Sequence, residues 1–177
     1  HAKQAGSQHW QFFSGDMESS TQNRVRLLTE LRSALQQGKG LRLHYQPQVA
    51  SGSTELLGCE ALIRWVKPSG EMVSPEVFIP LAEYTGMIVD IGEWVISEAC
   101  RQVVRWDAQG MPGFRMGINI SAAQFREADF VAKTARIITE SGVDPARLEF
   151  EITESVAMED PLSVANQLRE LKALGLR

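Results

Sequence analysis

Polar residues recur at every second position in three short segments of this sequence. In one segment Glu60 and Arg64 lie on the same side as Leu62, and apolar residues fill the positions between them. Asn119 and Glu151 each alternate with apolar neighbours in the same way. Because successive side chains of a strand point to opposite faces, residues two apart share one face. Each segment therefore predicts a strand with one apolar face and one face that carries polar groups.

The polar faces offer oxygen atoms of the kind that bind hard metal ions. Glu60, Asn119 and Glu151 supply carboxylate and amide oxygens, which Mg²⁺ and Mn²⁺ prefer as ligands. Such ions catalyse phosphoryl chemistry because they activate a water and neutralise charge on the phosphate. Arg64, on the face of Glu60, can bind a phosphate through its planar guanidinium. The alternative for Arg64 is an ion pair with Glu60 itself.

The segments between these strands are helix-like, and the alternation predicts the fold class. Strands are expected over residues 41–49, 56–66, 114–120 and 148–152. Helices are expected around residues 25–37, from 74, from 95 to about 110, over 130–141 and over 160–174. Such alternation implies an α/β protein whose mostly parallel sheet is covered by helices. The strands fit about half of an eight-stranded barrel. An open doubly wound sheet is the rival, although no Gly-x-Gly-x-x-Gly follows the first strand to support it.

A covered sheet changes the meaning of the polar face. Parallel sheets normally have both faces covered, and an unpaired buried carboxylate is costly. Such carboxylates are therefore expected to be paired, protonated or bound to a metal. In a barrel the polar faces would line the interior near its mouth, where barrel enzymes keep their chemistry. A set of half-solvated strands with their polar sides in water is the alternative that requires no site.

The composition is that of a globular protein and argues against several function classes. Of 177 residues, 44% are hydrophobic and 23% are charged, and the net charge of -4 argues against a binder of polymeric nucleic acid. The 2 cysteines and 3 scattered histidines form neither a disulfide framework nor a zinc cluster, which favours a cytoplasmic location. No apolar run of about 18 residues and no signal peptide is visible. A chain that begins without Met is expected to be a piece of a longer protein.

Five segments resemble, in order and spacing, the EAL family of cyclic-di-GMP phosphodiesterases. They are Tyr45-Gln46-Pro47, Glu60-Ala61-Leu62-Ile63-Arg64-Trp65, Phe78-Ile79-Pro80-Leu81-Ala82-Glu83, Asn119-Ile120-Ser121 and Glu151-Ile152-Thr153-Glu154. The resemblance implies a TIM-like (β/α) barrel of the EAL type, with only about its first half in this chain. It also implies hydrolysis of one phosphodiester bond of cyclic di-GMP to give the linear dinucleotide in bacterial signalling.

The resemblance further implies roles for individual residues. The expected ligands of Mg²⁺ or Mn²⁺, with Ca²⁺ as an inhibitor, are Glu60, Asn119 and Glu151. The residues expected around the nucleotide and its phosphate are Gln46, Leu62 and Arg64.

Glu154 matches a family glutamate that steadies the loop beside the metal site and links it to a homodimer interface. Glu60 and Glu154 are therefore the expected catalytic residues. Two alternatives stay open, because Gln46 at a strand end can bond to nearby backbone and Glu154 can be a carboxylate favoured near a helix start.

The domain organisation follows from the same resemblance. Residues 1–13 resemble the end of a GGDEF (diguanylate cyclase) domain, residues 14–23 have the composition of a linker, and residues 24–177 form the EAL portion. In the family a paired-aspartate segment follows the position of Leu174-Gly175-Leu176-Arg177, and a lysine and further acidic ligands come later. We therefore expect this chain alone to be inactive. The alternative to an enzyme is an inactive EAL domain that acts as a cyclic-di-GMP receptor or a protein-interaction module.

Overall fold

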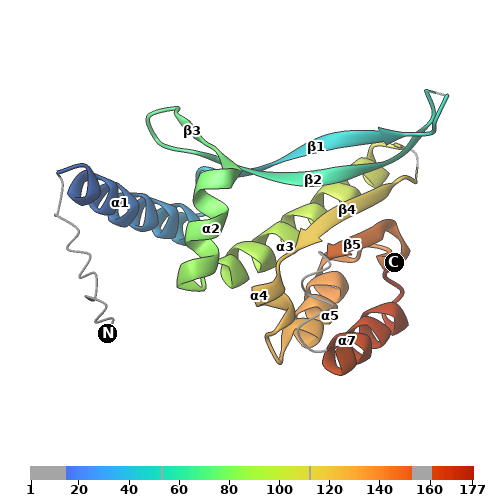
Figure 1. The fold of residues 1–177 in the computed structure, drawn as a ribbon. Coiled ribbons are helices and arrows are strands. Elements are labelled where there is room, and N and C mark those ends of the chain that lie inside the picture. The colour runs from blue at the N-terminus through green and yellow to red at the C-terminus, as the bar shows by residue number, and fades with distance from the viewer. Residues whose placement is uncertain (1–14, 53, 112, 153–160) are drawn as a thin grey trace, which may run out of the picture.

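The computed structural model describes residues 15–52, 54–111, 113–152 and 161–177. The segment predicted to be a GGDEF remnant and the predicted site residue Glu154 lie outside these ranges. The elements, which Figure 1 labels, are α1 (Gly15–Gln37), β1 (Leu41–Val49), β2 (Leu56–Val66), β3 (Met72–Val73), α2 (Pro75–Thr85), α3 (Met87–Ala108), β4 (Arg115–Ile120), α4 (Ala122–Phe125), α5 (Phe130–Ser141), the 3-10 turn η1 (Pro145–Arg147), β5 (Leu148–Ile152) and α7 (Pro161–Ala173).

The strands form one sheet in the order β1-β2-β4-β5, and the short β3 pairs with β2. The pairs β2–β4 and β4–β5 are parallel, as predicted. The pair β1–β2 is antiparallel, which corrects the expectation of a mostly parallel sheet at its first strand. The reason is the short connection between residues 49 and 56, since a parallel pair needs a crossover of about a dozen residues or more.

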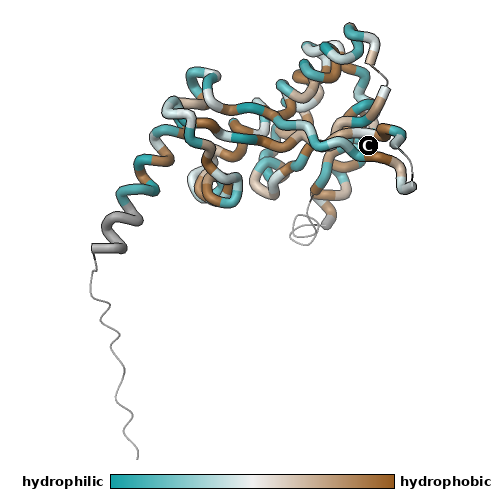
Figure 2. The backbone as a smooth tube through the Cα atoms, turned by 90° about the horizontal axis from the view of Figure 1, so that it is seen from above, coloured by the Kyte–Doolittle hydropathy of each residue, from teal (hydrophilic) through white to brown (hydrophobic). Residues whose placement is uncertain are grey.

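The apolar face of the sheet forms the core. Trp65, Met116, Ile118 and Leu148 are at most 1% exposed on this face. Helix α2 covers it where Phe78 packs edge-on against Trp65, with ring centroids 5.7 Å apart. Figure 1 shows α2, α3, α5 and α7 on one side of the sheet. In Figure 2 hydrophobic and hydrophilic stretches alternate along the chain, as expected when one side of each element is covered.

The boundaries of several elements agree with the local signals in the sequence. Strand β5 coincides with the predicted residues 148–152. Helix α2 begins at Pro75, where the fixed φ of proline suits the first helical position. Helix α5 ends at Ser141 and is capped by Gly142, which adopts the left-handed conformation with a φ of 71°. The short strand β3 and helix α4 were not predicted.

Helix α1 begins earlier than its apolar repeat indicated. Its backbone is helical from Gly15, so the helix includes most of the polar segment predicted as a linker between domains. The role of residues 14–23 as a linker stays a prediction. Leu31 anchors the helix, because its side chain is only 1% exposed in the core. None of the helices in the described part of the chain is long and apolar enough to cross a membrane.

Candidate functional site

The polar face of the sheet brings two of the predicted ligands into direct contact. Asn119, near the carboxyl end of β4, donates a hydrogen bond from Nδ2 to Oε1 of Glu60 on β2 over 2.6 Å. The two residues are neighbours because β2 and β4 run parallel with Glu60 in register with Gly117, two positions before Asn119. With Nδ2 engaged, Oδ1 of Asn119 remains available as a ligand.

The third predicted ligand lies on the neighbouring strand. Glu151 of β5 is directly in register with Asn119. Burial, followed by the charges of Glu60 and Glu149, raises the pKa of Glu151 above its ordinary value. The sheet therefore gathers like charges from separate strands at one place, an arrangement that a bound cation would stabilise.

Gly117 provides the space that the Glu151 carboxylate occupies. A Cβ atom at position 117 would lie only 2.6 Å from Oε1 of Glu151, much closer than an ordinary contact. Glycine in the middle of a strand weakens it and often marks a close approach of another group. That signal is visible in the sequence between Met116 and Ile118, but the alternation of polar and apolar residues gives a glycine no role of its own.

A second acidic group on this face is already paired. Glu149 accepts a hydrogen bond from Nη1 of Arg115 over 3.0 Å, and the two side chains are each 39% exposed. The guanidinium compensates much of the Glu149 charge, so Glu149 is not a free ligand. Glu60 and Glu151 are therefore the carboxylates of the candidate site among the described residues.

Strand β1 contributes the predicted substrate residue Gln46. The antiparallel register places it directly opposite Glu60, so the two side chains lie on one face. Leu62 follows Glu60 on the same face of β2, opposite His44 of β1. Gln46 is exposed and Leu62 is half-buried, which leaves Gln46 accessible on the polar face.

Arg64, another predicted substrate-binding residue, makes its hydrogen bond to the neighbouring residue in the chain. Its Nη1 donates a hydrogen bond to the backbone carbonyl of Ile63 over 2.8 Å. Within the described ranges Arg64 makes no salt bridge, so the ion pair with Glu60 that was the alternative for Arg64 is not formed. The phosphate contact of Arg64 stays a prediction.

The donor set fits a hard divalent cation, though not a complete cage. Two carboxylates and one amide oxygen converge from Glu60, Glu151 and Asn119, and these are the oxygen ligands that Mg²⁺ and Mn²⁺ accept. The pKa of Glu151 is raised, and the missing side chain at Gly117 leaves room for its carboxylate. Both observations are consistent with a cation-binding site. In the part of the chain that the structure describes, no cluster of three or more His, Cys, Asp or Glu residues is placed to hold a metal.

The comparison with protein families decides the assignment. The family model of the EAL domain matches residues 28–177. The chain belongs to the EAL-domain family. This match confirms the resemblance found in the sequence. It begins four residues after the predicted start of the EAL portion at residue 24.

Two curated relatives of this EAL chain come from Pseudomonas aeruginosa. The bifunctional diguanylate cyclase/cyclic di-GMP phosphodiesterase MucR is 40% identical over 176 residues, which is 99% of this chain and 26% of MucR. The cyclic di-GMP phosphodiesterase PA2567 is 33% identical over 167 residues, which is 94% of this chain and 28% of PA2567. The EAL chain therefore spans about a quarter of the length of these relatives.

Solved structures of EAL proteins share the fold of this chain. A structure described as the MucR phosphodiesterase in complex with c-di-GMP has a TM-score of 0.80 and 41% identity, covering 85% of this chain and 61% of that one. A structure of the EAL enzyme Bd1971 with cAMP and cyclic di-GMP bound has a TM-score of 0.78 and 28% identity, covering 89% of this chain and 43% of that one. These matches confirm the predicted α/β class and the TIM-like architecture, of which this EAL chain contains a part.

Proposed function

We propose that this chain contributes to the metal-dependent hydrolysis of cyclic di-GMP to the linear dinucleotide in bacterial second-messenger signalling. The observation that carries the proposal is the convergence of Glu60, Asn119 and Glu151 from three adjacent strands. Relatives that are 40% and 33% identical are named as cyclic di-GMP phosphodiesterases. Membership of the family and an oxygen-ligand site on the polar face together favour this function over other α/β barrel chemistry.

Each site residue then has a distinct task. Glu60, Asn119 and Glu151 hold Mg²⁺ or Mn²⁺, and Ca²⁺ occupies the same site without supporting turnover. The ion, when bound, supplies the activation of a water and the neutralisation of phosphate charge. The hydrogen bond from Asn119 fixes the Glu60 carboxylate on the polar face. Glu60 and Glu154 are the catalytic residues of this proposal.

The substrate is held beside the ligands by residues of the first two strands. Gln46, opposite Glu60 on the same face, offers an amide to the nucleotide. Leu62, two residues after Glu60 on β2, gives the nucleotide an apolar contact. Arg64 donates to a phosphate oxygen, for which its guanidinium retains free N–H groups beyond the one bonded to Ile63.

Further ligands for the ion come from outside the described residues in this proposal. Two carboxylates and one amide do not complete the six oxygen positions of Mg²⁺, and the MucR chain whose structure matches is longer than the matched part. We expect the 177 residues alone to bind the ion weakly and to be inactive. Detectable metal-dependent hydrolysis by this exact chain would contradict that expectation.

The wider setting of the protein is proposed on the same basis. MucR is described as bifunctional, with diguanylate cyclase and phosphodiesterase activities, which supports the interpretation of residues 1–13 as the end of a GGDEF domain. The EAL portion would work in the cytoplasm as a homodimer, with Glu154 near the interface. Light scattering of the complete protein tests the dimer.

The decisive experiment uses the complete protein that contains this chain. Glu60→Ala should abolish hydrolysis of cyclic di-GMP and reduce Mn²⁺ affinity measured by calorimetry. Glu140→Ala is the matched control, because Glu140 is an exposed carboxylate on α5 with a side chain 70% exposed. If Glu60→Ala retained turnover, the ligand assignment would be wrong. Tight binding of cyclic di-GMP without any turnover by the unaltered protein would instead favour the receptor function.

A further inference from the structure

The loop that follows the ligand Asn119 is fixed by a buried glutamine. Oε1 of Gln124 accepts hydrogen bonds from the backbone N–H of Ser121 over 3.1 Å and from its hydroxyl over 3.0 Å. In return, the Oγ of Ser121 accepts from the backbone N–H of Gln124 over 3.2 Å. This reciprocal capping box closes two residues after Asn119. It therefore holds the chain at the point where β4 ends and the ligand is presented.

Gln124 is buried against helix α3, where a glycine makes room for it. The Gln124 side chain is 3% exposed. A Cβ atom at Gly92 of α3 would lie 1.7 Å from its Nε2 and 2.1 Å from its Cδ. Glycine inside a helix is destabilising relative to alanine, so its position in the middle of α3 requires a reason. The close approach of Gln124 supplies that reason.

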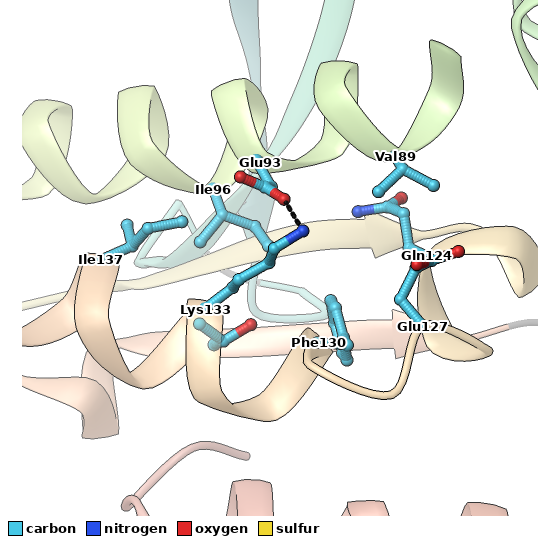
Figure 3. Close-up of a pocket in the computed structure, with 9 residues that line it drawn as sticks. Val89, Glu93, Ile96, Gln124, Glu127, Phe130, Lys133 and Ile137 are labelled. Atoms are coloured by element: carbon cyan, nitrogen blue, oxygen red, sulfur yellow. Dashed lines mark ion pairs between the residues drawn. The ribbon is translucent and has the colours of Figure 1, made fainter. Parts of the chain in front are cut away.

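The surroundings leave Gln124 little freedom to move. Figure 3 shows Gln124 close to α3 and to the side chain of Val89. The adjoining cavity has a volume of about 10 Å³, which is at the lower limit for one water. Nζ of Lys133 on α5 bridges to Glu93 on α3 over 2.7 Å and ties the two helices together at this cavity. The cavity is therefore no ligand site, and the Lys133–Glu93 bridge is not part of the capping box that holds Gln124.

We propose that Gln124 is a positioning residue for the metal site and that Gly92 is its complement on α3. Gln124 anchors the end of β4 to the long helix rather than to the short α4 alone. Asn119 is thereby held at hydrogen-bonding distance from Glu60. The inference rests on the proposed function, because it assigns Gln124 to the same metal site.

The test is a double-mutant cycle in the complete protein, read by Mn²⁺ affinity in calorimetry. Gln124→Ala removes the acceptor for Ser121, and we expect Mn²⁺ affinity to fall about 10-fold or more, the size of loss typical when a group that orients a metal ligand from outside is removed. Gly92→Ala should cause a similar loss, because its methyl group displaces Gln124. The double variant should be no worse than Gln124→Ala, since the displaced side chain is already gone.

A matched control separates positioning from general destabilisation. Lys133→Met breaks the bridge to Glu93 at the same cavity but leaves the capping box intact, so Mn²⁺ affinity should stay within about twofold of the unaltered protein. Hydrogen exchange at the Ser121 amide gives a second readout that needs no metal. Its protection should fall in Gln124→Ala and in Gly92→Ala and should persist in Lys133→Met.

The outcomes distinguish this inference from the proposed function. If Gln124→Ala loses protection at Ser121 but keeps its Mn²⁺ affinity, the positioning role is wrong and the proposed function stands. Equal losses of affinity in Gln124→Ala and Lys133→Met also overturn the positioning role, because the effect is then general. If the unaltered protein binds no Mn²⁺ and hydrolyses no cyclic di-GMP, the proposed function fails and this inference with it.

Discussion

Replacing Gly117 by alanine should damage the candidate metal site without unfolding the protein. The new Cβ would lie 2.6 Å from Oε1 of Glu151. An ordinary contact requires about 3.4 Å, so the carboxylate has to retreat by about 0.8 Å. A misplacement of about 1 Å at a reacting centre can cost about 100-fold in rate. We therefore expect Gly117→Ala to lower both Mn²⁺ affinity and turnover by about 10- to 100-fold.

The stability of the Gly117→Ala variant should remain close to that of the unaltered protein. Alanine restricts the unfolded chain more than glycine does, which stabilises the folded state by about 0.4 to 1 kcal/mol where the backbone tolerates it. The nearest backbone atom to the new Cβ is the Cys59 carbonyl oxygen at 3.6 Å, an ordinary distance. The free energy of unfolding, measured with denaturant, should thus change by less than about 1 kcal/mol.

The assay compares Gly117→Ala with a matched substitution in the segment that leads into the same strand. Gly113 is exposed, and a Cβ there would meet nothing closer than Nη1 of Arg147 at 3.8 Å. Gly113→Ala should therefore leave Mn²⁺ affinity and turnover unchanged. The reasoning is refuted if a folded Gly117→Ala variant binds Mn²⁺ as tightly as the unaltered protein. A loss of several kcal/mol in stability would show instead that the strand, rather than Glu151, has moved.

Three further predictions concern the site and the core. Asn119→Ala removes the hydrogen bond to Glu60 and should weaken Mn²⁺ binding in calorimetry about 10-fold or more. Unchanged affinity would show that Asn119 is not a metal ligand. Trp65→Ala deletes a side chain that is 1% exposed and should cost about 3 to 5 kcal/mol in denaturant unfolding, so a loss below about 1 kcal/mol would contradict the described core. Burial raises the pKa of the Cys59 and Cys100 thiols from 9.0 to about 11. The stability that the neutral thiols contribute below pH 9.0 should therefore be lost as the pH rises from 9.0 to about 11. A denaturant midpoint that stays constant over this pH range would contradict the burial of both thiols.

The sequence predicted the strand positions and the site face because both depend on local alternation. Glu60 and Glu151 stood out as polar residues in otherwise apolar strands, and the register of the sheet places them near one another. The boundaries of β5 were predicted for the same reason, since Leu148 follows a turn and starts a clear alternation. Local patterns of this kind require no knowledge of which strands pair.

The features that were missed depend on contacts between distant segments. The antiparallel direction of β1 is set by its pairing with β2, and an apolar alternation is the same for either direction. Gly92 and Gln124 meet only after α3 and the end of β4 have packed together. Gly117 has significance only once Glu151 is placed beside it. A glycine in the middle of a helix or strand is the one sequence signal that could have indicated such contacts.

The β1–β2 hairpin also has a consequence for the order in which the site is assembled. Hairpin contacts join residues close in sequence and can form within microseconds, whereas parallel pairing must first close a long loop. Gln46 and Glu60 lie on the hairpin, but Asn119 is 59 residues away from Glu60. We expect the substrate side of the site to be organised early in folding and the cation side late. A metal ion would then stabilise the finished domain while leaving the rate of its first folding steps unchanged.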